Sequence, residues 1–341
     1  MNLGSPEALT VPAVREYLNE FLMDERVIDL PYWSRRALVS LLLIKRPKVK
    51  VEEYGSIWTD EGSPLIVTSR KVQTALQGQF DFPVELAMNY AKPRIADALD
   101  RLQAAGVEEL FIMPLYPHYA MSSYETVVVK VMTQLREKGN PFTTSLLQPF
   151  YEDSDYIEVL HEMAKPDLDA GFDHLLFTFH GVPQRHLRKS DPSHEHCLST
   201  PDCCSTCHPA HATCYRHQCL RTAHALVNRA GIPGEKYSVS FQSRLGRDPW
   251  LEPYTDQTLE RYGRQGMGRL LVISPSFVSD CLETLEEIDI AGAETYKGAG
   301  GGDFKLIPCF NDHPSWISFL NGRIKGWLDG SLNCSVGQLA K

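Results

Sequence analysis

The sequence lacks features that mark several classes of protein. Its net charge is −9 at pH 7, so the chain offers no polycationic surface for nucleic acid. It has no apolar run near the ~20 residues of a membrane-spanning helix. Since no charged-then-apolar leader opens the chain, nothing suggests secretion, and we expect a cytoplasmic protein. The hydrophobic fraction of 43% is ordinary for a globular fold. No feature indicates an oligomeric state.

Cysteine, in contrast, is abundant. Nine cysteines without an export signal argue against a disulfide framework and for metal binding. The segment 193–214 has no apolar periodicity and is crowded with cysteine and histidine, which indicates an insertion on an existing scaffold. Its cysteines are Cys197, Cys203, Cys204, Cys207 and Cys214, and Cys219 follows in the next expected helix.

The most basic stretch, 35–50, surrounds a short apolar run, 37–44. Two interpretations stay open for it. One is a core helix edged with charge. The other is an interfacial lip for an apolar ligand or for the inner face of a membrane, with Tyr32 and Trp33 at its margin.

Strand-like and helix-like segments alternate along the chain, which predicts α/β architecture with parallel sheets flanked by helices. We expect one half in 1–150, another in 151–330 and a polar tail in 331–341. The expected strands are 82–91, 109–115, 142–148, 175–180, 236–241, 270–274 and 304–307. The expected helices are 93–103, 123–137, 156–164, 216–230, 254–263, 279–291 and 313–329.

An internal echo supports two similar halves. Both 109–119 and 269–277 combine a strand, a Pro-containing turn and an aromatic residue, and each leads to a Ser-led helix start. Two such halves predict strand ends that face one cleft.

His180 lies where the apolar run 175–179 meets the turn residues Gly181 and Pro183. A lone histidine at such a place is often a core residue. However, the end of a buried strand is also where open α/β sheets bind ligands. A fixed turn there lets imidazole accept a proton or hold a metal.

Glu283 and Glu287 stand four residues apart at the start of an expected helix. A solvated acidic face is the ordinary interpretation. The nearby strand end favours a functional Glu283 more than a functional Glu287. Three aromatic stretches, containing Tyr54, Tyr116 and Trp250, could line a pocket for a large flat ligand.

Several blocks together resemble the signature blocks of the protoporphyrin ferrochelatase family, over nearly the whole chain. They are Asn2-Leu3-Gly4-Ser5-Pro6, Gly62-Ser63-Pro64, 115–119, His180-Gly181-Val182-Pro183, 242–246 with 249–251, and 276–287. The resemblance implies two Rossmann-like, chelatase-type halves around a porphyrin cleft. It also implies insertion of Fe²⁺ into protoporphyrin IX, the last step of haem synthesis.

The resemblance further implies roles for single residues. His180 would contact iron or remove pyrrole protons, and Glu283, with Glu287 beside it, would handle the metal. The positions that match porphyrin contacts are Tyr54, Ser63 and Trp250, with Tyr116 in a matching block and Arg46 a looser match. The alternatives are a coproporphyrin ferrochelatase, another tetrapyrrole chelatase, and a non-catalytic haem or metal carrier.

The sequence departs from the family in two places. Cys281 stands where some relatives have a histidine, and the insertion interrupts the Gly-Asp-Pro-Tyr stretch between Pro192 and Tyr215. Some relatives hold a [2Fe–2S] cluster in such a segment, and a structural zinc site is the alternative. The expected ligands are Cys197, Cys204, Cys207 and Cys214, with Cys203 and Cys219 as alternatives.

Overall fold

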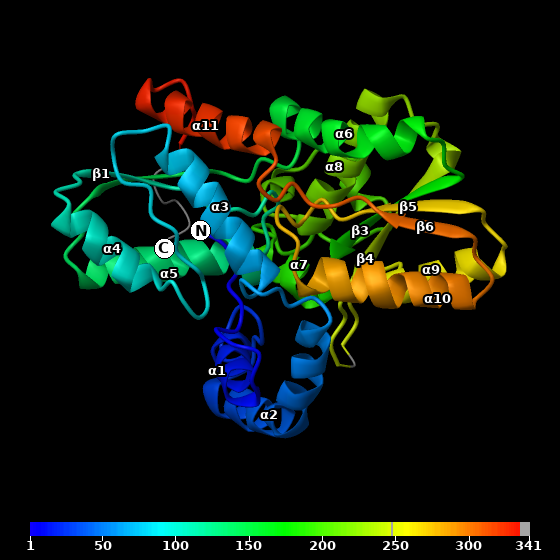
Figure 1. The fold of residues 1–341 in the computed structure, drawn as a ribbon, viewed down its shortest axis with the longest axis horizontal. Coiled ribbons are helices and arrows are strands. Elements are labelled where there is room, and N and C mark those ends of the chain that lie inside the picture. The colour runs from blue at the N-terminus through cyan, green and yellow to red at the C-terminus, as the bar shows by residue number, and fades with distance from the viewer. Residues whose placement is uncertain (247, 335–341) are drawn as a thin grey trace. The chain divides into compact units, whose positions relative to one another are not determined.

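The computed structural model describes residues 1–246 and 248–334 and consists of two compact units. The first unit contains Met1–Tyr116, Met121–Gln148 and the segment from Asn311 on, and the second contains Pro117–Ala120 and Pro149–Phe310. Each unit has a parallel sheet flanked by helices (Figure 1). The predicted α/β class is therefore confirmed.

The first unit is built on β1 (Glu109–Ile112), which pairs in parallel with β2 (Thr143–Leu146). Helices whose apolar positions recur with helical period make up the other regular structure of this unit. They are α1 (Val11–Leu22), α2 (Tyr32–Gly55), α3 (Pro64–Gln77), α4 (Ile95–Ala104), the π-helix η1 (Met121–Glu125), α5 (Thr126–Glu137) and α11 (Pro314–Leu328).

The second unit is built on a parallel sheet with the order β4-β3-β5-β6. Its strands are β3 (His174–His180), β4 (Tyr237–Gln242), β5 (Arg269–Ile273) and β6 (Asp303–Leu306). Its helices are α6 (Ser154–Asp169), α7 (Gln184–Ser190), α8 (Tyr215–Ala230), α9 (Thr255–Arg264), the π-helix η5 (Leu282–Gly292) and α10 (Ala293–Gly298). Short 3₁₀ turns occur at η2 (Cys203–Ser205), η3 (Pro209–Ala212) and η4 (Gly234–Lys236).

Helices cover both faces of this second sheet. In Figure 1, α6 and α8 lie together on one face, while α9 and α10 lie together on the other. Leu176 of β3 packs with Leu259 of α9 and Ile288 of η5 in a buried cluster. Successive side chains of a strand alternate between faces, so His180 shares the face of Leu176.

Four expectations differ from the structure. The segment 82–91 is not a regular strand: Pro83 has no N–H to donate, and the N–H of Met88 bonds to the carbonyl of Pro93 at 2.7 Å. The helix expected over 279–291 is a π-helix from Leu282, followed by α10. The helix expected over 123–137 likewise begins with a π-helical turn, η1. Helices α1 and α3 were not expected.

The predicted halves also differ from the units at the C-terminus. We assigned 151–330 to the second half, but α11 belongs to the first unit, where Trp327 stacks on Phe111 of β1 with ring centroids 5.1 Å apart. The stacked aromatic pair attaches α11 to the first unit, although the preceding residues of the chain belong to the second unit. The predicted tail, 331–341, lies mostly outside the described residues. None of the helices in the described ranges is long and apolar enough to span a bilayer.

Candidate active site at the carboxyl edge of the second sheet

His180 is the last residue of β3, next to Gln242 at the end of β4. Its ring Nδ1 lies 2.6 Å from the carbonyl oxygen of Gly181. A carbonyl can only accept, so Nδ1 carries the hydrogen in this contact. In the neutral ring, Nε2 therefore keeps the lone pair, which can take a proton or bind a metal.

The turn after His180 requires glycine at position 181. The Gly181 N–H donates to the carbonyl of Gln242 at 2.7 Å. A Cβ on Gly181 would lie 2.7 Å from that same oxygen and 3.2 Å from Cε3 of Trp250. Pro183 forms an antiparallel bridge with Trp250, whose indole N–H donates to Leu245. The predicted Trp250 is thus placed against the His180 turn.

Glu287 of η5 is held by the residue that follows β4. The Ser243 N–H donates to one carboxylate oxygen of Glu287 at 2.8 Å, and its hydroxyl donates to the other at 2.5 Å. Gln242 donates to the carbonyl of Glu283 at 2.7 Å. The turn from β4 thus holds the acidic helix at the strand ends.

The electrostatics of Glu287 depend on these neighbours. Burial raises the pKa of its carboxyl, and the charge of Glu283 raises it further. The Ser243 hydrogen bonds and the neighbouring His180 lower it in part. A carboxyl that titrates above its ordinary range beside an imidazole is suited to proton transfer.

The start of η5 is fixed by side-chain hydrogen bonds. Cys281 is the N-cap and exchanges capping bonds with Thr284. Asp280 accepts from the Thr284 hydroxyl at 3.1 Å and from the Cys309 N–H at 3.2 Å. Cys281, at the position where some relatives have a histidine, is buried, and burial raises the pKa of its thiol.

The structure thus brings His180, Glu287, Glu283 and Trp250 to one edge of the second sheet. The remaining predicted porphyrin residues belong to the first unit. Tyr54 and Ser63 are buried near the end of α2 and at the start of α3, and Tyr116 is half-buried, with burial of its hydroxyl raising its pKa. Arg46 is half-buried and lines the hollow along α2. Their role toward a ligand stays a prediction.

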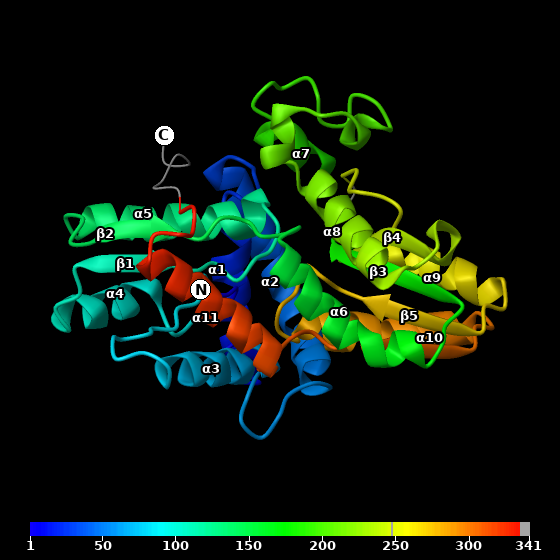
Figure 2. The same cartoon turned by 90° about the horizontal axis from the view of Figure 1, so that it is seen from above.

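The predicted insertion connects α7 to α8 and extends away from the sheet (Figure 2). Asp191 anchors its base by accepting from the backbone N–H groups of Ser193, His196 and Cys197 at 2.8–2.9 Å. Burial alone would raise the pKa of Asp191, but these bonds hold it well below its usual range. At the far end, the Thr213 hydroxyl donates to Ser190 at 2.5 Å.

Sulfur atoms gather inside the insertion. The Cys214 thiol is in hydrogen-bond contact with Cys197 and with Cys204, and Cys204 contacts Cys203. Cys203 is buried, whereas Cys207 is exposed. Across the described ranges, no group of three or more His, Cys, Asp or Glu side chains is arranged to hold a metal ion.

Sequence reasoning missed three polar residues at this edge. They are Ser243, Ser276 and Tyr215, and the last two bond the backbone of His180. Each carried a signal, because Ser243 and Ser276 lie in signature blocks that follow strands and Tyr215 ends the interrupted Gly-Asp-Pro-Tyr stretch.

Comparison with known proteins agrees with this architecture. The solved structure described as SirB from Bacillus subtilis with Fe3+ matches with a TM-score of 0.53 at 13% identity. The match covers 79% of this chain and 93% of that one. The likeness concerns the fold alone.

The sequence comparisons are more specific. The ferrochelatase family model matches residues 1–326. A ferrochelatase of Opitutus terrae is 50% identical over 97% of each chain, and one of Ectopseudomonas mendocina is 51% identical over 94% of each. The chain belongs to the ferrochelatase family and is therefore an enzyme, a metal chelatase.

Proposed function

We propose that this ferrochelatase inserts Fe²⁺ into protoporphyrin IX to form protohaem, with His180, Glu283 and Glu287 as its catalytic groups. The supporting observation is the tautomer of His180. Its Nδ1–H is engaged by the Gly181 carbonyl, so its Nε2 lone pair is available at the strand edge that also carries Glu287.

The chemistry balances around these groups. Two pyrrole N–H protons must leave as the metal binds four ring nitrogens. His180 Nε2 accepts one proton or contacts the arriving iron. Glu287 accepts a proton because its pKa is raised toward the working pH. Glu283 on the same helix helps to strip water from Fe²⁺, since carboxylate oxygens replace that water.

Porphyrin binding requires an apolar surface with a few polar groups. We assign this role to Trp250 of the second unit and to Tyr54, Ser63, Tyr116 and Arg46 of the first. Holding the macrocycle bent would point a pyrrole lone pair at the metal and favour the transition state over the flat substrate.

Metal insertion by the purified protein tests this proposal. Anaerobic protein with Fe²⁺ and protoporphyrin IX should yield the metalloporphyrin spectrum, and His180→Ala should lower kcat about 10²-fold or more. His174→Ala is the matched control, because His174 begins the same strand. Tight binding without turnover would contradict the proposal. A kcat/KM that is higher for coproporphyrin than for protoporphyrin IX would identify coproporphyrin as the substrate.

We also propose that the insertion holds a [2Fe–2S] cluster. The segment supplies the thiols that such a group needs, and Cys214 contacts Cys197 and Cys204. No group of three or more described His, Cys, Asp or Glu side chains is arranged around one metal ion, whereas zinc would require four ligands around one point. Exposure of Cys207 and burial of Cys203 favour Cys197, Cys203, Cys204 and Cys214 over the set that includes Cys207. Such a group would supply redox and structural chemistry.

Spectroscopy distinguishes the two metals. Anaerobically purified protein should show visible absorbance and a paramagnetic signal on reduction, and Cys203→Ser should remove both while Cys207→Ser keeps them. A colourless protein with stoichiometric zinc would refute the cluster. If Cys207→Ser also removes the signal, the original ligand set is correct.

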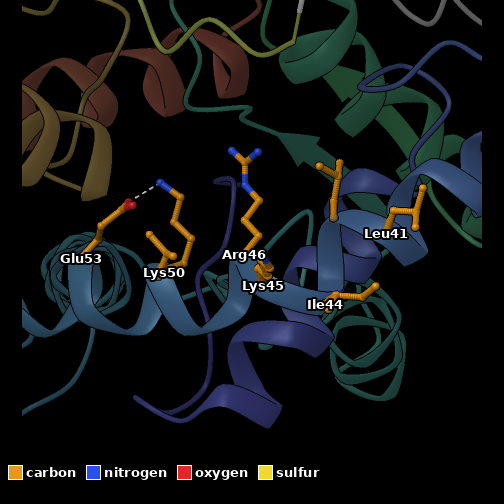
Figure 3. Close-up of a pocket in the computed structure, with 8 residues that line it drawn as sticks. Leu41, Ile44, Lys45, Arg46, Lys50 and Glu53 are labelled. Atoms are coloured by element: carbon orange, nitrogen blue, oxygen red, sulfur yellow. Dashed lines mark hydrogen bonds and ion pairs between the residues drawn. The ribbon is translucent and has the colours of Figure 1, made fainter.

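Finally, we propose that the enzyme works in the cytoplasm with α2 in peripheral contact with the inner face of the membrane. Exposure disfavours a core helix: Trp33 is 80% exposed, Leu41 67% and Ile44 62%. Figure 3 shows these leucine and isoleucine side chains beside Lys45 and Arg46, lining an open hollow of about 500 Å³. Apolar and basic groups together suit an anionic lipid surface.

Flotation with anionic vesicles should be lost in Leu41→Asp, and unchanged flotation would refute the contact.

A further inference from the structure

Tyr215 joins the cysteine-rich insertion to the strand end that carries His180. It is the first residue of α8 and directly follows Cys214, the N-cap of that helix. Its hydroxyl donates to the backbone carbonyl of His180 at 2.9 Å. The chain from one residue to the other runs through the whole insertion, yet the two are in direct contact.

The backbone N–H of His180 is also hydrogen-bonded. The His180 N–H donates to the hydroxyl of Ser276, which follows β5, at 3.3 Å. Tyr215 in turn shares a hydrogen bond with Ser276 and another with the Cys219 thiol one turn along α8. The tyrosine is only 6% exposed. Both backbone groups of His180 are thus fixed by Tyr215 and Ser276.

The N-terminal end of α8 is equally tied to the insertion. Cys214 contacts the thiols of Cys197 and Cys204, and the Cys197 N–H is held by Asp191. A rearrangement of these thiols displaces the Cys214 side chain and its backbone. Because Tyr215 is the next residue, it is displaced as well. A single peptide bond therefore joins Cys214, whose thiol contacts the other cysteines, to Tyr215, which holds His180.

We propose that Tyr215 is a positioning residue that couples the arrangement of the insertion cysteines to the His180 peptide, and so to the direction of its Nε2. Its effect on turnover rests on the proposed function; the coupling itself does not. A shift of the His180 carbonyl turns the His180–Gly181 peptide, and the following carbonyl of Gly181, which contacts Nδ1, moves with it. The cysteine-rich insertion then acts on the metal site through one hydrogen bond.

The first test is Tyr215→Phe, which keeps the buried ring and removes the donor. We expect kcat to fall about tenfold, in line with loss of one hydrogen bond. KM for the porphyrin should stay within twofold, because His180 acts on the metal and protons. Tyr262→Phe is the matched control: its hydroxyl donates to Ser238 at 2.9 Å near the start of the same sheet, and kcat should be unchanged. Unchanged kcat in Tyr215→Phe, or an equal loss in Tyr262→Phe, would overturn the proposal.

The second test measures the coupling without turnover, on the metal-loaded protein. Hydrogen exchange of the amides in 177–183 should increase in Cys197→Ser. In the Tyr215→Phe background the same cysteine substitution should add little further increase. Additive effects in the double variant would show that the insertion reaches His180 by another route. If exchange behaves as expected but no protein variant inserts metal, the coupling stands and the proposed function fails.

Discussion

At the scale of single residues, Ser243 combines backbone strain with two hydrogen bonds to one carboxylate. Its φ is +64°, a left-handed value that residues other than glycine rarely adopt. This conformation turns both its N–H and its hydroxyl toward Glu287. Strained conformations of this kind cluster at functional sites because surrounding contacts stabilise them. Ser243 thus holds Glu287 in place and stabilises its charged form.

Replacing Ser243 should therefore change the pH dependence of catalysis. Ser243→Ala removes a donor that lowers the pKa of Glu287, so the protonated form gains and the pKa rises further. The carboxylate must be ionised to accept a proton, and the acid limb of kcat against pH should move upward by about one unit. Ser240→Ala, in the strand that precedes Ser243, controls for general effects. A downward shift or none would show that Glu287 does not control this limb.

Gly181 is the second residue at this scale, and its backbone position leaves no room for a side chain. In Gly181→Ala the new methyl group would meet the Gln242 carbonyl at 2.7 Å. The turn must then shift, so we expect a loss of about 1–3 kcal/mol in the free energy of unfolding together with reduced kcat. Gly234→Ala is the control, because nothing lies within 4 Å of its Cβ. Denaturant unfolding and metal insertion measure both effects; wild-type kcat in Gly181→Ala would contradict the assigned turn.

The sequence allowed part of this site to be predicted. His180 and Glu287 carry recognisable side-chain chemistry next to apolar strands, and Gly181 marks a turn. Ser243 and Tyr215 were not assigned their contacts. A left-handed φ and a hydrogen bond across an inserted segment depend on tertiary packing, which local patterns do not record.

At the scale of elements, Asp191 stabilises the insertion at its base. The Asp191 carboxylate accepts three backbone N–H groups and the Ser193 hydroxyl, the last at 2.7 Å. Its pKa is lowered by these bonds. The stabilisation is therefore complete above the ordinary pKa of an aspartate and is lost only as pH falls through the lowered value.

Asp191→Asn should open the insertion at neutral pH. The amide keeps one acceptor oxygen and presents N–H groups to donors, so about half of the bonds are lost. Limited proteolysis should cleave within 193–214 at least about tenfold faster, given ~1.5–3 kcal/mol for each charge-assisted bond. Asp202→Asn makes the same charge change at an exposed position in the same insertion. Equal rates in the two variants would contradict the anchoring role.

The elements also show where pattern reasoning ends. Buried strands such as β3 and β5 were predicted within a residue or so, because continuous apolar runs identify them. The π-helical form of η5 was not predicted, since π-helices are rare and occur mostly as short bulges inside segments that otherwise read as α-helix. The strand predicted over 82–91 was wrong, because apolar residues alone do not provide a neighbouring strand to pair with.

At the scale of the whole molecule, the two units differ in how much sheet supports them. The β4-β3-β5-β6 sheet of the second unit is covered by helices on both faces. In the described part of the first unit, β1 pairs with β2. An isolated pair of strands is only marginally stable in water unless other elements pack against it. The first unit therefore depends on its helices, including α11 from the other end of the chain.

Removing the α11 contact should loosen one unit and leave the other unchanged. Trp327→Ala removes the ring stacked on Phe111 of β1, at a cost of about 1–2 kcal/mol for a half-buried aromatic pair. We expect faster hydrogen exchange in 109–112 and 143–146, with the amides of β3 and β5 unchanged. Leu328→Ala, its 54% exposed neighbour, should leave both sheets as in the wild type. A uniform rise across β1 and β3 would mean that the chain unfolds as a single cooperative body, with α11 stabilising both units.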